Sequence, residues 1–487
     1  MTQKIDDAAK WMHELNKSTN NTFCAAKWYN ASIWLGNGMT ASCHHPPPHK
    51  IDPEEVKQNP NALHNTLYKK LVRKEMQEGK QTRECEYCWK IENLNKNLTS
   101  DRFYKSSIYD LDENVFAFKQ DWKQDIDLKT LEISFDSNCN LACSYCNAGF
   151  STTWAHDINK NGAYQNLISD GWGAFAHNGQ WAMPYGPKNE NNPFIAAFWK
   201  LWENKLQYSL TELRITGGEA MVSKHFWKLI DWFEQHPQCN VRLGINTNLI
   251  AKREHLDRLC ELSKYHEVIL YTSNESYGIH AEYIRDELVW DEWIDNFKYV
   301  IHNGSFKHIH VMMTISALCL VSMDKFHEEI VNIRRDATVF VDSSHNILRF
   351  PSFQSIVTLP NEIRLERAAH YENWLADNKD TLHTHEIDGI TRVIEYIRNV
   401  DEGHSITDYS DLNDRQRDFK SFFVQYDDRR NKDFNSAFSD WPMLLEWYNT
   451  IDATENLRKL DTLVDADATA WGKPIFSEIL KNYEDNV

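Results

Sequence analysis

The sequence predicts an α/β protein: a partial (β/α)6 TIM-type barrel with an N-terminal Cys-rich metal-binding module and a C-terminal helical extension. Three observations lead to this fold class. Seven of the ten cysteines fall into two tight groups. From about residue 128, short β-branched and aliphatic runs alternate with longer amphipathic stretches. From about residue 361, the chain is charged, helical in pattern and rich in Trp and Tyr. We therefore expect domains at 1–105, 125–360 and 361–487.

The N-terminal part, residues 1–105, has few strand signals. Three consecutive prolines at positions 46–48 exclude regular structure in the segment that follows Cys43. A helix is expected near residues 63–77, where apolar residues recur at helical spacing. Together with its cysteines, this pattern indicates a small module that a metal holds together.

The middle part predicts six strands separated by amphipathic helices. The expected strands are 129–135, 212–216, 241–246, 267–272, 308–315 and 338–348. The expected helices are 194–208, 224–235, 255–264, 293–297 and 323–335. Six such units are too few to close an eight-stranded barrel, so the barrel is expected to be open. The long crossover 158–193 lacks periodicity, and it is either a lid over the site or a surface insertion.

Composition and charge exclude several classes of protein. The chain has 487 residues, with 53 Lys and Arg against 71 Asp and Glu, a net charge of −18. Such a surface repels a phosphate backbone, so binding to nucleic acid is disfavoured. No run of eighteen apolar residues exists, and the first residues lack the apolar core of a secretory signal. We therefore expect a cytoplasmic protein that does not bind a membrane.

The sharpest motif is a C-x3-C-x2-C run formed by Cys139, Cys143 and Cys146, directly after the first predicted barrel strand. Three thiolates on one loop can hold three irons of a [4Fe–4S] cluster and leave the fourth iron open. An open metal position can bind a substrate or cofactor, and the carboxyl end of a barrel strand is where active sites lie. A structural zinc site and three unrelated buried cysteines are the alternatives.

This run resembles the signature of the radical S-adenosylmethionine (radical SAM) superfamily, including the aromatic Tyr145 just before the third cysteine. In that superfamily the open iron binds SAM, reductive cleavage yields a 5′-deoxyadenosyl radical, and the radical abstracts a substrate hydrogen. The resemblance therefore implies that the three cysteines are catalytic cluster ligands and that Tyr145 lies at the cofactor. It covers about residues 22–105 and 129–360.

Glycines after the second predicted strand add to the resemblance. Gly217, Gly218 and Glu219 are similar to the family's GGE motif, which lines the methionine end of SAM. Glycines lack a Cβ, so main-chain groups can approach the SAM ammonium closely, and Glu219 adds negative charge nearby.

The ends of the next two strands imply further SAM contacts. Asn248 belongs to a segment similar to a Thr-Asn-Gly element, but Leu249 stands where Gly is common. Ser273 stands where the family often places a serine that contacts the SAM carboxylate or ribose. Capping of the strand ends is the alternative for both residues. Arg285 is either a carboxylate-binding arginine or an exposed helical one.

The second cysteine group comprises Cys24, Cys43, Cys85 and Cys88. Four thiolates can saturate either a zinc ion or a [4Fe–4S] cluster, and the spacing alone does not choose between them. The spacing resembles the auxiliary-cluster modules called SPASM and twitch domains, which implies a second [4Fe–4S] cluster. In most enzymes of that type the module follows the barrel, whereas here it precedes it. A fully ligated cluster would accept an electron from a substrate radical or relay electrons to the first cluster.

The predicted function is therefore that of a radical SAM oxidoreductase or modifying enzyme with an auxiliary cluster. The SPASM and twitch resemblance implies a peptide or a small alcohol as substrate, and a flavodoxin or ferredoxin as reductant. Two other classes are left open. One is a non-catalytic iron–sulfur protein for electron transfer or redox sensing, and the other is a zinc-stapled interaction protein.

Overall fold

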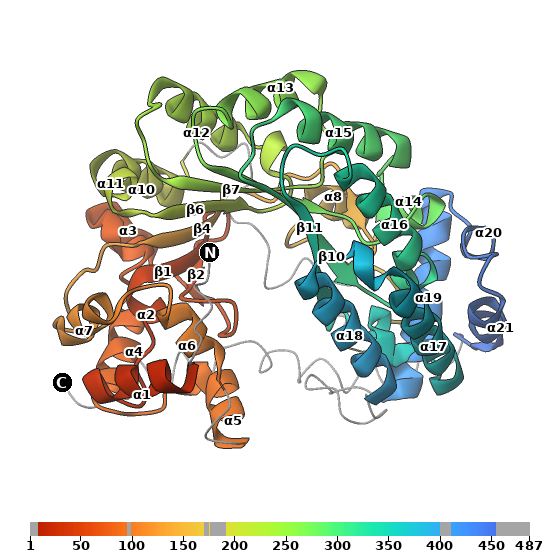
Figure 1. Cartoon of the computed structure of the whole chain (residues 1–487), viewed down its shortest axis with the longest axis horizontal. Coiled ribbons are helices and arrows are strands. Elements are labelled where there is room, and N and C mark those ends of the chain that lie inside the picture. Colours follow the sequence, from red (N-terminus) through yellow and green to blue (C-terminus); the bar gives the residue numbers. More distant parts are fainter. Residues whose placement is uncertain (1–7, 95–98, 170–174, 176–190, 400–410, 454–487) are drawn as a thin grey trace. The chain divides into compact units, whose positions relative to one another are not determined.

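A computed structural model describes residues 8–94, 99–169, 175, 191–399 and 411–453 (Figure 1). Its contacts divide the described residues into two compact units. The first unit takes the residues within Met1–Asp136 and Pro184–Arg214. The second takes those within Ser137–Met183 and Ile215–Asp465. The expected domains 1–105, 125–360 and 361–487 stay predictions.

Within the described residues, four strands lie wholly in the first unit. They are β1 (Asn30–Trp34), β2 (Met39–Ala41), β3 (His49–Lys50) and β4 (Thr130–Ser134). Strand β1 pairs parallel with β4, with Ile33 opposite Ile133, and antiparallel with β2, which pairs in turn with β3. The N-terminal part thus contributes strands that the sequence did not reveal, because they are short and bury several consecutive residues instead of alternating ones.

Short helices surround these strands. They are α1 (Ala8–Ser18), α2 (Ala26–Tyr29), α3 (Pro53–Gln58), α4 (Leu67–Gln77), α5 (Glu86–Leu94), α6 (Asp101–Ser106), α7 (Leu111–Lys119), α10 (Pro193–Leu201) and α11 (Gln207–Ser209). Helix α4 begins four residues later than expected, because the Thr66 side chain accepts a hydrogen bond from the Lys69 amide and caps the helix there. The buried core of this region includes Trp28, Met76 and Trp89 as well as three of the cysteines.

Parallel strands build the second unit, which confirms the α/β class. Strands β7 (Arg242–Thr247), β8 (Val268–Ser273), β10 (His308–Ile315) and β11 (Val341–Ile347) pair in that order, all parallel. Strand β6 (Glu212–Thr216) is the other neighbour of β7, and its residues from Ile215 onward belong to this unit. A separate two-residue pair joins β5 (Ala142–Cys143) to β9 (Arg285–Asp286). The partial barrel of six units stays a prediction.

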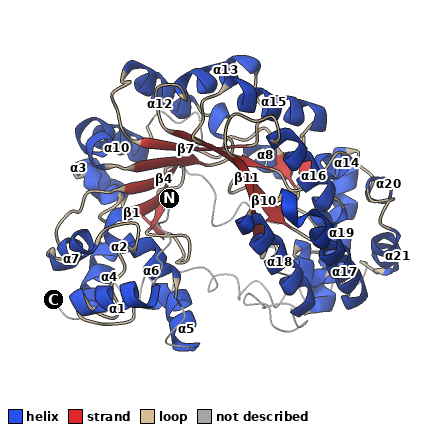
Figure 2. Ribbon diagram, in the orientation of Figure 1, coloured by secondary structure: helices blue, strands red, loops and turns tan. Residues whose placement is uncertain are grey.

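Amphipathic helices alternate with these strands, and Figure 2 shows α12, α13 and α15 along one side of the sheet. The helices are α8 (Thr152–Asn161), α12 (Lys224–Gln235), α13 (Arg253–Leu262), α14 (Ile279–Ile284), α15 (Trp290–Asn303) and α16 (Met323–Arg334). Helix α12 buries Phe226, Leu229, Ile230 and Phe233, one stripe at helical spacing. Strand β10 alternates strictly, so that His308 and His310 face away from the buried side.

The C-terminal extension is helical, as expected, in its described residues. It comprises α17 (Asn361–Asn378), α18 (Thr384–Asn399), α19 (Leu412–Arg430), α20 (Phe434–Ala437) and α21 (Pro442–Thr450). Most of the crossover 158–193, expected to be either a lid or a surface insertion, lies outside the described residues, since 170–174 and 176–190 are not described. Within the described part of the chain, no helix has both the length and the apolar composition that crossing a bilayer requires.

Candidate functional site

A cavity of about 240 Å³ in the second unit brings together the residues that the sequence singled out around the C-x3-C-x2-C run. It lies at the carboxyl ends of β6, β7 and β8. Its lining includes Cys139, Cys143, Tyr145, Cys146, Gly217, Gly218, Glu219, Asn248 and Ser273. These residues come from four separate stretches of sequence, so their meeting in one cavity is a property of the fold and not of local spacing.

The first turn of α8 holds the cysteine loop. The Cys139 amide donates a hydrogen bond to Thr152 Oγ1 at 3.2 Å, and Thr153 Oγ1 donates to the Cys139 carbonyl at 2.6 Å. In the middle of the loop, Trp154 Nε1 donates to the Cys143 carbonyl at 2.9 Å. The backbone of the loop is therefore held at Cys139 and at Cys143, by hydrogen bonds that use none of the thiols.

The three thiols are free and largely shielded from water. Burial, together with the neighbouring Cys143 thiol, raises the pKa of Cys139 to about 12. Burial likewise raises the pKa of Cys143 and of Cys146. Thiolates crowded in such a place need a compensating positive charge, and a metal centre that binds thiolates supplies it. The donor set therefore fits an iron–sulfur cluster ligated by three cysteines.

The position of Gly218 admits only glycine. A Cβ at this residue would lie 2.2 Å from the carbonyl oxygen of Asn138 and 2.6 Å from that of Ser137. Both are backbone atoms of the segment that leads into the cysteine loop, and the Glu219 amide donates to the same Asn138 oxygen at 2.6 Å. The Gly-Gly-Glu turn and the cysteine loop are thus packed backbone to backbone.

Glu219 is a buried carboxylate with three hydrogen-bond donors. It accepts from Thr247 Oγ1 at 2.8 Å, from the Asn248 amide at 2.6 Å and from the Met221 amide at 3.1 Å. Burial raises its pKa to about 7, although these hydrogen bonds oppose the shift. Its carboxylate joins the end of β6 to the end of β7 and places negative charge beside the cavity.

Asn248 connects the Gly-Gly-Glu side of the cavity to the cysteine loop. Its side-chain amide donates to Asn140 Oδ1 at 2.8 Å, and its own oxygen accepts from the Ile250 amide at 3.0 Å. The next residue, Leu249, has a φ of 60°, in the left-handed region that glycine adopts most easily. A buried leucine therefore adopts the left-handed conformation at this position.

Sequence reasoning missed the polar group behind the cysteines. Arg285, expected to be either a ligand-binding or an exposed helical arginine, is buried in β9, so the exposed alternative is wrong. It pairs with the buried Glu275 at 2.6 Å, and its Nη1 lies 3.6 Å from Cys143 Sγ. Tyr145 donates its hydroxyl to Glu275 at 3.2 Å. The available signal was the polar run from Asn274 to Glu275, directly after a buried strand.

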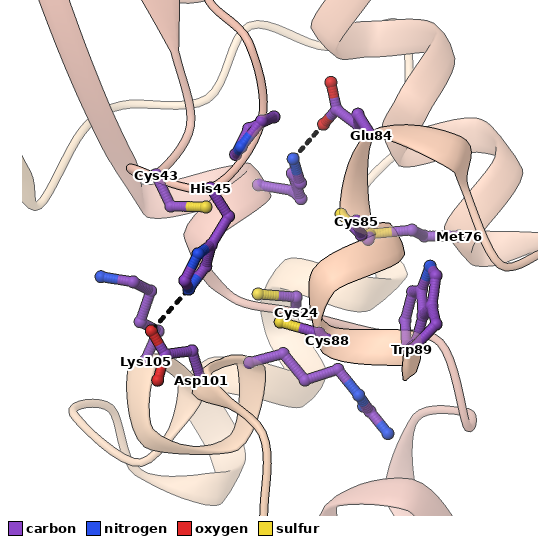
Figure 3. Close-up of a pocket in the computed structure, with 13 residues that line it drawn as sticks. Cys24, Cys43, His45, Met76, Glu84, Cys85, Cys88, Trp89, Asp101 and Lys105 are labelled. Atoms are coloured by element: carbon purple, nitrogen blue, oxygen red, sulfur yellow. Dashed lines mark hydrogen bonds and ion pairs between the residues drawn. The ribbon is translucent and has the colours of Figure 1, made fainter. Parts of the chain in front are cut away.

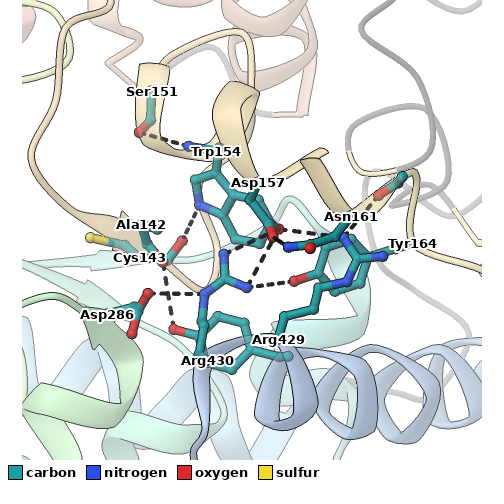
Figure 4. A network of polar contacts seen from close by, with 12 residues as sticks. Ala142, Cys143, Ser151, Trp154, Asp157, Asn161, Tyr164, Asp286, Arg429 and Arg430 are labelled. Atoms are coloured by element: carbon teal, nitrogen blue, oxygen red, sulfur yellow. Dashed lines mark hydrogen bonds and ion pairs between the residues drawn. The ribbon is translucent and has the colours of Figure 1, made fainter. Parts of the chain in front are cut away.

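Helix α19 supports the same loop from the C-terminal extension (Figure 4). Arg430 forms ion pairs with Asp157 of α8 at 3.4 Å and with Asp286 of β9 at 3.0 Å. Its Nη1 donates to the Tyr164 hydroxyl at 2.8 Å. Tyr426 donates its hydroxyl to the Ala142 carbonyl at 3.5 Å. The extension, which carried no motif, therefore packs directly behind Cys143.

The second cysteine group meets in the first unit around a small cavity of about 20 Å³ (Figure 3). Cys24, Cys43, Cys85 and Cys88 all line it, and all four are buried. Burial raises the pKa of Cys24 to about 11 and that of Cys85 to about 12. The buried Lys27 pairs with Glu84 at the rim of this cavity. Four thiols that line one pocket are enough to ligate a zinc ion or a [4Fe–4S] cluster fully.

The chemistry of the donors leaves the metal of each cysteine group open. Thiolates ligate both zinc ions and iron–sulfur clusters. Three cysteines line the cavity in the second unit, and four line the pocket in the first unit.

Comparison with known proteins adds little. No protein-family model matches the chain, and no curated protein matches it. It is similar to Streptococcus suis SuiB bound to S-adenosylmethionine, with 12% identity and a TM-score of 0.32 over 71% of this chain and 68% of that one. It is also similar to SuiB bound to precursor peptide SuiA, with 13% identity and a TM-score of 0.30 over 72% and 70%. TM-scores this low carry no argument about function.

Proposed function

We propose that this protein is a radical SAM enzyme whose reaction takes place in the cavity beside Cys139, Cys143 and Cys146. One observation carries the proposal. The three thiols line the same cavity as Gly217 and Gly218 and as the polar residues Asn248 and Ser273 at the ends of two strands. A simple electron carrier needs only cluster ligands. A cavity lined by glycines and polar groups next to the thiols is what binding of a second molecule requires.

The three cysteines are proposed to hold a [4Fe–4S] cluster, with SAM against the Gly-Gly-Glu turn, Asn248 and Ser273. When bound, the pair would supply reductive cleavage of SAM, in which one electron from the reduced cluster breaks the S–C5′ bond and gives methionine and a 5′-deoxyadenosyl radical able to abstract a hydrogen atom. The chain's own residues place and hold these groups. Gly217 lines the cavity without a side chain, so its backbone is accessible to a ligand's ammonium, and ionised Glu219 favours that positive charge. Arg285 offsets the charge of the Cys143 thiolate.

The second group, Cys24, Cys43, Cys85 and Cys88, is proposed to hold an auxiliary [4Fe–4S] cluster, with zinc as the alternative. Because four cysteines saturate it, this cluster would not bind SAM. We propose that it accepts or relays electrons during oxidation or modification of a peptide or small-molecule substrate. The proposed reductant is a flavodoxin or ferredoxin, and the proposed location is the cytoplasm.

The decisive experiment is anaerobic reconstitution with iron and sulfide, then reduction with dithionite. EPR with and without SAM and a chromatographic assay for 5′-deoxyadenosine follow. We expect a [4Fe–4S]⁺ signal that SAM perturbs, together with 5′-deoxyadenosine formation. A cluster indifferent to SAM that yields no 5′-deoxyadenosine would favour the electron carrier. Zinc without acid-labile sulfide would favour the interaction protein.

Cysteine variants separate the two proposed clusters. Cys139→Ala should abolish 5′-deoxyadenosine formation and leave the iron of the first unit in place, while Cys239→Ala, outside both groups, should change neither. Retained cleavage in Cys139→Ala would contradict the assignment of the catalytic cluster.

The auxiliary role has its own variant. Cys85→Ala should spare reductive SAM cleavage and lower the yield of modified product. An unchanged product yield would reduce the four-cysteine group to a structural role.

A further inference from the structure

Three histidines contact one buried aspartate in the second unit, far along the sequence from both cysteine groups. His308 Nε2 and His310 Nδ1 both lie 2.5 Å from Asp342 Oδ1. His385 Nε2 lies 2.8 Å from the other oxygen, Oδ2. The atoms of His308, His310 and Asp342 all fall within 4.8 Å of one another. Three groups able to ligate a metal thus lie at one place, and His385 contacts the second oxygen of the same carboxylate.

The fold brings these residues together by strand register and by one helix start. His308 and His310 lie on the same face of β10, because side chains alternate along a strand. Asp342 stands opposite His310 in the parallel pairing of β10 with β11. His385 lies in the first turn of α18. The face of β10 that carries both histidines is therefore polar, in contrast to its buried aliphatic face.

Neighbouring side chains fix the orientation of these imidazole rings. In metal sites, the second ring nitrogen of a histidine ligand usually makes a hydrogen bond that fixes the ring in the same way. His310 Nε2 lies 2.7 Å from Ser344 Oγ, so in the tautomer protonated at Nε2 this nitrogen donates to the serine, and Nδ1 is the atom that faces Asp342. His385 stacks on His383 with ring centroids 5.7 Å apart, and the Phe340 ring lies 5.0 Å from that of His308. Only His385 is half exposed, with 49% of its side chain accessible, so an ion can enter from that side.

This cluster is separate from the three-cysteine cavity. Thr314, near the carboxyl end of β10, lines that cavity, whereas His308 is the first residue of the same strand. Six residues of β-strand span roughly 20 Å. The histidine cluster therefore lies at the opposite, amino end of the parallel strands.

We propose that His308, His310 and Asp342 bind a divalent transition-metal ion of the zinc type, with His385 as a fourth ligand. Imidazole nitrogen with one carboxylate oxygen is a donor set that zinc accepts in tetrahedral geometry. One aspartate gives the site a single negative charge to offset part of the charge of the ion. The bound ion ties the starts of β10 and β11 to α18, and this proposal does not depend on the proposed function.

The test is a titration of untagged, cluster-reconstituted protein with Co²⁺, followed by displacement with Zn²⁺. We expect one Co²⁺ with visible ligand-field bands but without the intense near-ultraviolet bands of thiolate ligation. His308→Gln should weaken its binding by about 100-fold, the upper range for disturbing a metal site. His302→Gln, an exposed histidine of α15, is the matched control and should bind Co²⁺ as the original protein does.

A second variant covers the case in which His308→Gln does not fold. His385→Gln changes a half-exposed side chain and should weaken Co²⁺ binding by about tenfold while the protein stays folded. In the unaltered protein, Zn²⁺ should also raise the midpoint of thermal unfolding, since it binds only the folded state. The proposal is overturned if Co²⁺ gives no spectrum of nitrogen ligation, or if His385→Gln gives the same spectrum as the unaltered protein. The three histidines and Asp342 would then be held together by hydrogen bonds alone.

Discussion

The buried pair of Arg285 and Glu275 gives a sharp test of how the cysteine loop is held. The two side chains are 5% and 0% exposed, and Arg285 Nη2 lies 2.6 Å from Glu275 Oε2. Arg285→Met removes the guanidinium and keeps a long apolar side chain. The Glu275 carboxylate then keeps its hydrogen bond from the Tyr145 hydroxyl, at 3.2 Å, but loses the positive charge of Arg285.

The expected cost follows from burial. Removing one partner of a fully buried ion pair leaves an uncompensated charge and costs about 3–5 kcal/mol of unfolding free energy. The double variant Arg285→Met with Glu275→Gln removes both charges and should lie within about 2 kcal/mol of the unaltered protein. The Cys143 thiol also loses the positive charge 3.6 Å away. Its pKa should rise further, and the three-cysteine site should take up less iron.

The assay is urea unfolding of the metal-free, reduced protein, together with the iron content after reconstitution. Arg258→Met is the matched control, because Arg258 pairs with Asp231 and Glu234 at the surface. Exposed ion pairs contribute about 0–1 kcal/mol, so this variant should be nearly neutral. If Arg285→Met costs no more than Arg258→Met, or if the double variant is as unstable as the single one, the reasoning is refuted.

Three further predictions concern single positions. Gly218→Ala places a Cβ 2.2 Å from the Asn138 carbonyl, so it should destabilise by about 1–3 kcal/mol in urea and lower iron uptake at the three-cysteine site. Burial lowers the pKa of His327 to about 3 and also lowers the pKa of His345. Both histidines are therefore neutral in the folded protein above pH 6.5, and the free energy of unfolding decreases as the pH falls from 6.5 towards 3, because the unfolded chain takes up these protons first. In His327→Gln, the free energy of unfolding should decrease with falling pH less steeply, by about 1.4 kcal/mol per pH unit. Urea unfolding at several pH values between about 6.5 and 4.5 measures this slope. Leu249→Gly relieves about 1–2 kcal/mol of left-handed backbone strain but loses more than about 2 kcal/mol of buried side chain, so urea unfolding should show a net loss of stability.

Strongly periodic elements were predictable from the sequence. The bounds of β6, β10 and α12 match the expected ranges 212–216, 308–315 and 224–235 residue for residue. Each has a single apolar face that its neighbours bury, so the period appears directly in the sequence. Strand β1 was missed because its central residues, Ala31 to Ile33, are all buried, and a short run of that kind has no period.

The candidate site was predictable where side chains come from strand ends. Gly218 and Asn248 come just after β6 and β7, and Ser273 is the last residue of β8, so all three lie at strand ends that line one cavity. The pair of Arg285 with Cys143 was not predictable. It depends on two strands of two residues each, β5 and β9, that pair across a sequence separation of 142 residues. Neither strand is long enough to leave a pattern.

The C-terminal helices show how a segment without motifs can still determine a site. Arg430 of α19 bridges Asp157 and Asp286, which lie on the two elements that flank Cys143. A guanidinium can satisfy two carboxylates at once because its donors point in several directions from one plane. The cysteine loop is thus fixed from behind by a residue almost 290 positions further along the chain. Arg430 contacts residues next to the cysteines and not the thiols themselves. Helix α19 therefore helps to position the three thiols without contributing a metal ligand of its own.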